Sequence, residues 1–261
     1  MFDAFYEPDG DHYLATELTR GPWDPGAQHA GPPSALLARE IEKLSDSERF
    51  QVGRIAFDIL RPVPIGPVQV SARVLRPGRR VQLVEAELSD GEQVLMRATA
   101  WRLEITDLDL PPGSVVETPT PLAPQQGRDS DFFPTDQEHG YHSAVEITFA
   151  AGRFMELGPA TAWLRMRVPL VAGEDPTPLQ RTLVAGDVGN GISAALDFRR
   201  YIFVNVELTI HLERMPAGEW IGVDARTLPQ ATGVATAESV LFDGEGRIGR
   251  AAQTLIVSER R

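Results

Sequence analysis

The strand-rich segments of this 261-residue chain occur twice, at a fixed spacing. Residues 57–61 (FDILR) align with residues 210–214 (IHLER), 153 positions later. The turn at residues 90–91 (DG) matches the turn at residues 243–244 (DG) with the same spacing. The units of solenoid proteins repeat every ~20–50 residues, so a spacing this long indicates a duplicated subdomain. A chain of this kind is expected to fold as two copies of one architecture.

Each copy has the same expected order, with one helix before a run of long strands. The first helix is expected over residues 32–44, where prolines stand at the start and apolar residues recur at helical spacing. The second is expected over residues 175–189, which open with Asp-Pro-Thr-Pro. Alternating apolar residues and Asp-Gly turns predict strands at residues 13–18, 53–60, 67–76, 80–89, 93–104, 142–149, 161–169, 202–213, 219–228, 233–242 and 247–258.

A stretch with little periodicity separates the two copies. Residues 105–140 are rich in Pro, Asp, Ser, Thr and Gln, which is typical of a linker. The predicted organisation is therefore an N-terminal unit over residues 1–104, a linker over 105–140 and a C-terminal unit over 141–261. The chain length suits two domains of about 130 residues each.

Composition argues against several classes of function. The 25 basic and 37 acidic residues give a net charge of −12, which disfavours nucleic acid or an anionic membrane as the main partner. The absence of cysteine excludes disulfides, a thiolate nucleophile and cysteine metal sites. Residues 1–9 do not look like a signal peptide, and no apolar run approaches the ~20 residues that span a bilayer. We expect a cytoplasmic protein.

The two copies differ in polarity at equivalent positions. Val52 and Ala100 of the first copy become Asn205 and Gln253 in the second. Asp187 stands near the end of the second expected helix, among apolar and small residues. Polar residues in only one copy indicate a duplicated fold that carries one functional site.

One helix and four or five antiparallel strands, present twice, make an α+β pattern. The pattern resembles a tandem (double) hotdog, in which each half is a curved antiparallel β-sheet wrapped around one central helix. Asp187, Asn205 and Gln253 resemble, in position, the Asp, the Thr or Ser, and the Gln of the type II acyl-CoA thioesterases. The family's strand motif, a hydroxyl residue opening a strand that ends in Arg before Pro, is matched by residues 205–216, except that Asn205 replaces the hydroxyl residue.

The resemblance implies hydrolysis of an acyl-CoA thioester to a free acid and CoA. This reaction needs an activated water and donors directed at the developing oxyanion. Asp187 is expected to act as the general base, and the amides of Asn205 and Gln253 are expected to hold the water. Because Asn cannot supply the alkoxide that Thr could, a water-mediated route is favoured over a covalent one.

A second candidate segment, residues 28–33 (QHAGPP), precedes the first expected helix. It resembles the His-Gly-Gly segment that opens the helix of many hotdog thioesterases, with Ala30 in place of one Gly. Unpaired N–H groups at a helix N-terminus suit a carbonyl oxygen, and the two prolines that follow leave Gly31 as the expected oxyanion donor. His29 is a further candidate, and an ordinary helix start is the alternative. We expect Gly31 to face Asp187 across a groove shared by both copies.

Two other functions remain open from the sequence. The first is a hotdog hydratase or dehydratase, whose Asp–His dyad would have to use His29. The second is a non-catalytic acyl-thioester or lipid-binding protein. The replacement at Asn205 favours that second function, whereas Asp187 and Gln253 oppose it.

The expected partners follow from the thioesterase resemblance. The substrate is an acyl-CoA, with CoA as part of it, and neither a cofactor nor a metal ion is expected. The arginine pairs at residues 79–80 and 199–200 are candidates for binding the CoA phosphates. Three histidines (His139, His142 and His211) lack the cysteine or carboxylate company of a metal site. Nucleic acid and membrane insertion are not expected, whereas a dimer of double hotdogs is.

Overall fold

The computed structural model describes residues 3–114, 118, 121, 123–128 and 135–260. The elements of the first half are β1 (Tyr6–Asp9), β2 (His12–Ala15), α1 (Gly31–Glu42), β3 (Phe50–Ile59), β4 (Pro67–Arg76), β5 (Val81–Ser89) and β6 (Val94–Glu104). Those of the second half are α2 (Tyr141–Ala144), β7 (Val145–Ala151), β8 (Ala160–Met166), α3 (Pro178–Gly186), α4 (Gly189–Ile192), β9 (Tyr201–Leu212), β10 (Ile221–Pro229), β11 (Val234–Asp243) and β12 (Gly246–Glu259). Short 3₁₀ helices lie at Glu17–Thr19, Ser47–Arg49 and Pro124–Gln126.

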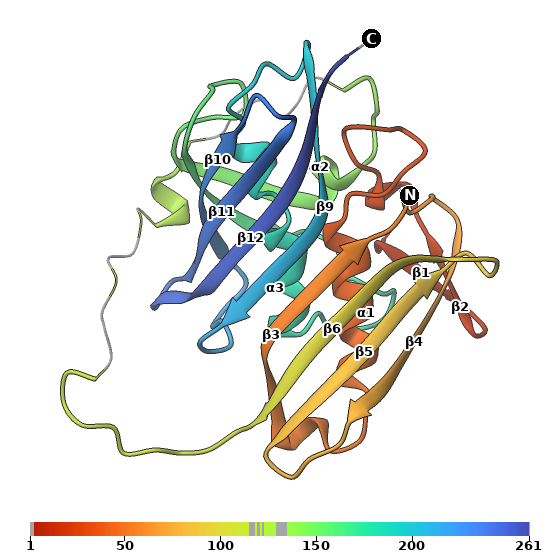
Figure 1. Ribbon diagram of the computed structural model, residues 1–261, viewed down its shortest axis with the longest axis vertical. Helices are drawn as coiled ribbons and strands as arrows, with labels where there is room; N and C mark the ends of the chain where they lie inside the picture. Colours follow the sequence, from red (N-terminus) through yellow and green to blue (C-terminus); the bar gives the residue numbers. More distant parts are fainter. Residues whose placement is uncertain (1–2, 115–117, 119–120, 122, 129–134, 261) are drawn as a thin grey trace.

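Within the described part of the chain, twelve strands form one antiparallel sheet in the order β1-β2-β4-β5-β6-β3-β9-β12-β11-β10-β8-β7. The two halves meet where β3 pairs with β9, and Ile55 lies opposite Ile210 at that junction. The sheets of the two copies therefore share a hydrogen-bonded seam, and β3 and β9 lie side by side near the centre of Figure 1. Part of the predicted linker lies outside the described residues, and the predicted unit boundaries at residues 104 and 141 stay a prediction.

The two long helices pack against each other on the inner side of this curved sheet (Figure 1). Alternate residues of the strands, such as Ile55 and Phe57, and the apolar face of α1, including Leu36 and Leu37, are fully buried. Buried residues from both halves join in one large hydrophobic core. No helix in the described ranges is long and apolar enough to cross a membrane.

The helices run antiparallel and approach closely at one end. A Cβ on Gly31, the first residue of α1, would lie 2.6 Å from the carbonyl oxygen of Val184 in the last turn of α3. At the other end, the side chain of Glu42 accepts a hydrogen bond from Thr177, which caps the start of α3. The start of each helix thus lies against the end of the other.

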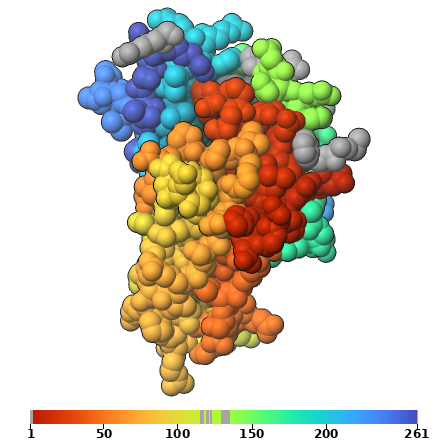
Figure 2. Space-filling model, turned by 90° about the vertical axis from the view of Figure 1, so that its right-hand side faces the viewer, coloured from red at the N-terminus to blue at the C-terminus, as the bar shows by residue number. Residues whose placement is uncertain are grey.

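The N-terminal strand connects the first half to the second. The Tyr6 N–H donates to the Leu170 carbonyl at 2.9 Å, and the Ala172 N–H donates to the Tyr6 carbonyl at 2.9 Å. Figure 2 shows this red N-terminal segment on the surface, beside the orange strands of the first half. The sequence analysis did not predict β1, because only four residues form it and three of them are exposed.

The second predicted helix is interrupted. Residues 175–189 were expected to form one helix, but α3 ends at Gly186 and a separate turn, α4, begins at Gly189. The break occurs because the Asp187 carbonyl accepts a hydrogen bond from the Gln253 side chain at 3.0 Å. The predicted strand at residues 142–149 likewise begins later, because α2 occupies Tyr141–Ala144.

We expect Gly31→Ala to push the two helices apart, because the new methyl group would overlap the Val184 carbonyl oxygen. Steric overlap in a packed core costs about 1–3 kcal/mol. Thermal denaturation should show a lower melting temperature than for Gly26→Ala, whose Cβ would lie 3.4 Å from Asp24 Oδ1 and meet nothing closer. Equal melting temperatures for the two variants would contradict the close approach.

Candidate active site

Asp187 lies at the C-terminal end of α3, inside the protein, with its side chain only 4% exposed. Two glycines flank it and bring the backbone close to the sheet. A Cβ on Gly189 would lie 2.6 Å from Ser239 Oγ and 3.0 Å from Gln253 Oε1. A Cβ on Gly186 would lie 2.7 Å from the Ile210 side chain. The small residues that surround Asp187 in the sequence therefore let its carboxyl group reach the inner face of the sheet.

A β-bulge aims Asn205 at this carboxyl group. Thr254 pairs with Glu207, but the next residue of β12, Leu255, pairs with Asn205, so Val206 is the extra residue of the bulge. A bulge shifts the alternation of side chains along a strand. As a result Val206 is exposed, whereas Asn205 points inward. Asn205 is the fifth residue of β9, and our expectation that it opens the strand was wrong.

The two amide side chains hold one oxygen of the carboxyl group. Asn205 Nδ2 donates to Asp187 Oδ1 at 2.8 Å, and Gln253 Nε2 donates to the same oxygen at 3.1 Å. Gln253 Oε1 accepts from the Asn190 N–H at 3.1 Å, which fixes the orientation of its amide. The structure thus brings together the three residues that the sequence singled out in the second half.

The start of α1 meets the other oxygen of Asp187. His29 Nδ1 lies 3.1 Å from Asp187 Oδ2 and 3.1 Å from the Gly31 nitrogen, which donates to it. The backbone N–H groups of Ala30 and Gly31 also donate to the Asp187 carboxylate. Gly31 and Asp187 therefore face each other across the boundary between the halves, where the positive end of the α1 dipole stabilises negative charge.

Burial shifts the ionisation of both groups of this pair. Burial raises the pKa of Asp187 to about 7, against the opposing effect of the hydrogen bonds from Asn205, Gln253 and the α1 backbone. Burial also lowers the pKa of His29 to about 3, so its imidazole is neutral near pH 7. Neutral His29 can donate from Nδ1 to ionised Asp187, or accept the proton of Asp187 when that group is protonated. One proton can therefore lie between the two side chains.

Tyr141 is a residue of this site that the sequence analysis did not select. Its ring stacks on the His29 imidazole, with centroids 3.8 Å apart and an angle of 8° between the planes. Its hydroxyl donates to the Val184 carbonyl at 2.7 Å, in the last turn of α3. Tyr141 thus supports both partners of the His29–Asp187 pair. A lone Tyr at the predicted start of a strand carries no signal of that role.

A cavity of about 310 Å³ opens beside the pair. Asp187, Asn205 and His29 line it, together with apolar side chains of both halves. The apolar wall consists of Trp23, Ile59, Val63, Met96 and Val204. Charged residues at the cavity are Arg61 and Asp24. The geometry therefore presents a buried acid and two amides to a pocket with mostly hydrophobic walls.

The arginine pairs predicted to hold phosphates do not line this cavity. Arg80 lies 3.6 Å from Glu104 in an exposed ion pair, and Arg79 uses its carbonyl to accept from Arg49. Arg199 and Arg200 lie against aromatic rings next to them in the sequence. Among the described residues, no three His, Cys, Asp or Glu side chains gather as a metal site would require.

Two family models match the chain. The model of the acyl-CoA thioesterase N-terminal domain matches residues 19–103, and that of the acyl-CoA thioesterase C-terminal domain matches residues 119–257. Together they span both copies of the repeat. Among curated proteins, no sequence matches the chain.

Solved structures resemble the chain over nearly its whole length. A thioesterase II candidate from Thermobifida fusca YX is 20% identical, with a TM-score of 0.74 over 96% of this chain and 93% of that one. A hot dog fold protein of unknown function from Alicyclobacillus acidocaldarius is 13% identical, with a TM-score of 0.73 over 99% and 97%. The acyl-CoA thioesterase II TesB2 from Mycobacterium marinum is 12% identical, with a TM-score of 0.66 over 97% and 94%. The predicted tandem hotdog fold is confirmed.

Replacement of Tyr141 separates its two contacts. Tyr141→Phe keeps the stacked ring but leaves the Val184 carbonyl without its donor, which should lower the free energy of unfolding by about 1–3 kcal/mol. Tyr141→Leu also removes the ring that buries His29, so the His29 pKa should rise toward its ordinary value of 6.5. NMR titration of the imidazole and denaturant unfolding measure the two effects. Tyr13→Phe, which removes a half-buried hydroxyl elsewhere, is the control, and an unchanged His29 pKa in Tyr141→Leu would refute the contact's role.

Proposed function

The chain belongs to the acyl-CoA thioesterase family, and we propose that it hydrolyses its substrate by letting Asp187 activate a water molecule beside Asn205. Membership of that family makes the chain a thioester hydrolase. The single observation that carries the residue assignment is the convergence of Asn205, Gln253 and the α1 N-terminus on one buried carboxyl group. A pKa of about 7 suits this carboxylate to general-base catalysis near neutral pH.

The two amides have different proposed tasks. Gln253 is committed to Asp187 through Nε2 and to Asn190 through Oε1, so we assign it to positioning the base. Among the described residues none donates a hydrogen bond to Asn205 Oδ1. That oxygen can therefore accept from a water molecule while Nδ2 still holds the carboxylate. This division refines our expectation that both amides hold the water.

In the proposed reaction, the oxygen of the water attacks the thioester carbon as its proton passes to Asp187. The C–S bond then breaks, and the proton goes from Asp187 to the CoA sulfur, so the base is restored. The start of α1 is the proposed site for the carbonyl oxygen, because the helix dipole favours developing negative charge there. The Gly31 N–H and the His29 imidazole are the groups we assign to that task.

The cavity sets the proposed substrate arrangement. The acyl chain would lie along the apolar wall formed by residues such as Val63 and Met96, with CoA directed outward. Arg61 replaces the predicted arginine pairs as the candidate for the CoA phosphates, because it is the arginine that lines this cavity among the described residues. The reaction as proposed uses no cofactor beyond the CoA of the substrate. A cytoplasmic location stays a prediction.

One observation favours a second candidate function. His29 Nδ1 and Asp187 Oδ2 lie 3.1 Å apart, which is the Asp–His contact that a hydratase or dehydratase would use. Hydration of an unsaturated acyl thioester adds water to a carbon–carbon double bond and leaves the thioester intact. Release of free thiol therefore distinguishes the two reactions, and its absence would leave the binding function as the third possibility.

Association into a dimer of double hotdogs also stays a proposal. It is supported by apolar residues on the outer face of the sheet, which recur at the 153-residue spacing in both copies. The exposed residues are Leu75, Val81 and Leu103 in the first copy and Leu228, Val234 and Ile256 in the second. A second copy of the chain could cover such repeated patches symmetrically.

Asp187→Asn should abolish the activity without unfolding the protein. The Asn oxygen can accept from Asn205 and Gln253, and its amide can donate to His29 Nδ1, but it cannot accept the proton of water. Loss of a general base typically costs about 10²–10⁴-fold in rate. Free-thiol release from a panel of acyl-CoAs measures the loss, with the exposed Asp224→Asn as the control. Full turnover by Asp187→Asn would place the base elsewhere.

The same variant should be at least as stable as the parent at pH 8. The folded-state pKa of Asp187, about 7, lies above the ordinary value of 3.8, so ionisation of the buried group destabilises the fold as the pH rises through 7. Asn removes that cost. A lower melting temperature for Asp187→Asn at pH 8 would contradict this sign.

The pH dependence of kcat/KM tests the role of Asn205. Activity should rise with pH through about 7, because the ionised carboxylate is the active form. The Asn205 donor lowers the pKa of Asp187, so Asn205→Ala should shift this rise to higher pH as well as lower the plateau. Asn205→Thr keeps a donor and should shift it less. An identical pH profile for Asn205→Ala and the parent would overturn the assignment.

A further inference from the structure

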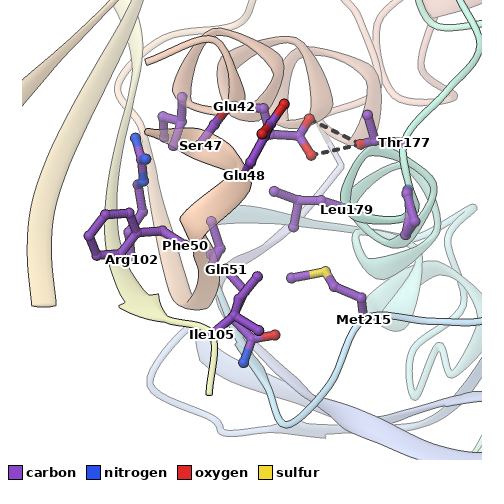
Figure 3. Close-up of a pocket in the computed structure, with 13 residues that line it drawn as sticks. Glu42, Ser47, Glu48, Phe50, Gln51, Arg102, Ile105, Thr177, Leu179 and Met215 are labelled. Atoms are coloured by element: carbon purple, nitrogen blue, oxygen red, sulfur yellow. Dashed lines mark hydrogen bonds between the residues drawn. The ribbon is translucent and has the colours of Figure 1, made fainter. Parts of the chain in front are cut away.

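A second cavity lies at the opposite ends of the two helices (Figure 3). It has a volume of about 290 Å³ and opens between the end of α1, the start of α3 and the first residues of β3. Its apolar lining includes Phe50, Val52, Leu179 and Met215. The proposed reaction uses none of these side chains.

The internal duplication relates this cavity to the one beside Asp187. Gln51, Val52 and Met215 line it, and at the 153-residue spacing they correspond to Val204, Asn205 and Pro62, which line the cavity at Asp187. The bulge of β9 also has a counterpart, because Val52 and Arg54 of β3 pair with consecutive residues of β6. The extra residue there is Gly53, the equivalent of Val206. Both cavities therefore have the same backbone frame.

The second cavity has no equivalent of the hydrolytic group. The positions of Asn205 and Gln253 are occupied by Val52 and Ala100, which cannot hold a water or a carboxylate. Glu42 supplies a carboxyl group at the end of α1, but Thr177 Oγ1 donates to both of its oxygens, at 2.9 and 3.0 Å. Gln180 donates to it as well, at 3.0 Å. Figure 3 shows Glu42 turned toward Thr177. The cavity can bind but is not equipped to hydrolyse.

Arg102 supplies an unused donor at the wall of the cavity. It is 2% exposed, donates through Nη2 to the Ser45 carbonyl at 3.1 Å and lies over the Phe50 ring. Its Nη1 is buried and has no hydrogen-bond partner among the described residues. The cross-strand neighbour Gln82 does not supply one, since its amide nitrogen donates to Gly78 and its Oε1 is also unpartnered. Buried guanidinium N–H groups are normally hydrogen-bonded, so an acceptor is missing here.

We propose that this second cavity binds a free aliphatic carboxylic acid, with its carboxylate on Arg102 and its chain along the apolar lining. The choice of ligand rests on the proposed function, because such an acid is the product released beside Asp187. The volume lies near the lower limit of small-molecule pockets, about 300 Å³, which selects a short- or medium-chain acid. The chain thus has a catalytic site and a product-binding site in equivalent positions of its two copies.

Two charged neighbours could oppose an anion in this cavity. Glu42 already accepts from Thr177 and Gln180, and burial raises its pKa, which makes its charge easier to neutralise. Glu48 is exposed to solvent at the rim, where water screens it. Arg102 is the buried cation of the lining, and a desolvated guanidinium–carboxylate contact is stronger than a surface pair.

Equilibrium dialysis of the full chain with radiolabelled octanoate tests the proposal without turnover. We expect two binding sites per chain, one beside Asp187 and one at Arg102. Arg102→Met should remove the second site or weaken it about tenfold or more, and leave thiol release from octanoyl-CoA within about twofold. Because binding of the acid is measured directly, failure of hydrolysis and failure of this second site are separate results.

A matched pair of surface variants keeps the test decisive if Arg102→Met does not fold. Ile105 lies at the cavity and is 54% exposed, so its replacement is tolerated. Ile105→Glu should weaken the second site, whereas Ile105→Lys should preserve or strengthen it. A single site per chain, which means a cavity filled by water, would overturn the proposal. Equal weakening by Glu and Lys, or tighter binding with Glu, would overturn it too, because the occupant would not be an anion.

Discussion

The contact between the start of α1 and the end of α3 is the constraint on which the site depends. A carboxylate at a helix C-terminus is disfavoured by the dipole of its own helix. Asp187 occupies that position on α3, and the N-terminal N–H groups of α1 compensate for it. Such compensation requires the helices to approach until only glycine fits at position 31. The ionisation of Asp187 is therefore a property of the pair of helices rather than of either half.

Sequence patterns predicted most of the framework because the strands are long and their alternation is regular. The four strands from β3 to β6, and their copies from β9 to β12, lie close to the predicted ranges. Prediction failed where tertiary contacts override local preference. The Gln253 side chain ends α3 at Gly186, and β1 is held by backbone bonds to residues that lie more than 160 positions away. No local pattern contains such information.

The candidate site was partly visible in the sequence for a chemical reason. Asn205 and Gln253 stood out because their equivalents in the first copy are apolar, and Asp187 because its neighbours are small. The direction of their amides was not visible, since it depends on the Asn190 N–H and on a bulge that turns Val206 outward. Tyr141 was missed for the same reason. Its importance arises from a ring that stacks on His29, 112 positions earlier in the chain.

The backbone bonds between Tyr6 and residues 170–172 affect the order in which the molecule can be made. During synthesis at about 5–20 residues per second, Tyr6 leaves the ribosome roughly ten seconds or more before its partners exist. Throughout that interval the N-terminal segment has an unpaired backbone edge, which is open to other nascent chains. His29 likewise waits for Asp187. The first copy of the duplication therefore matures only after the second has emerged, and the last step of folding closes the seam and completes the site together.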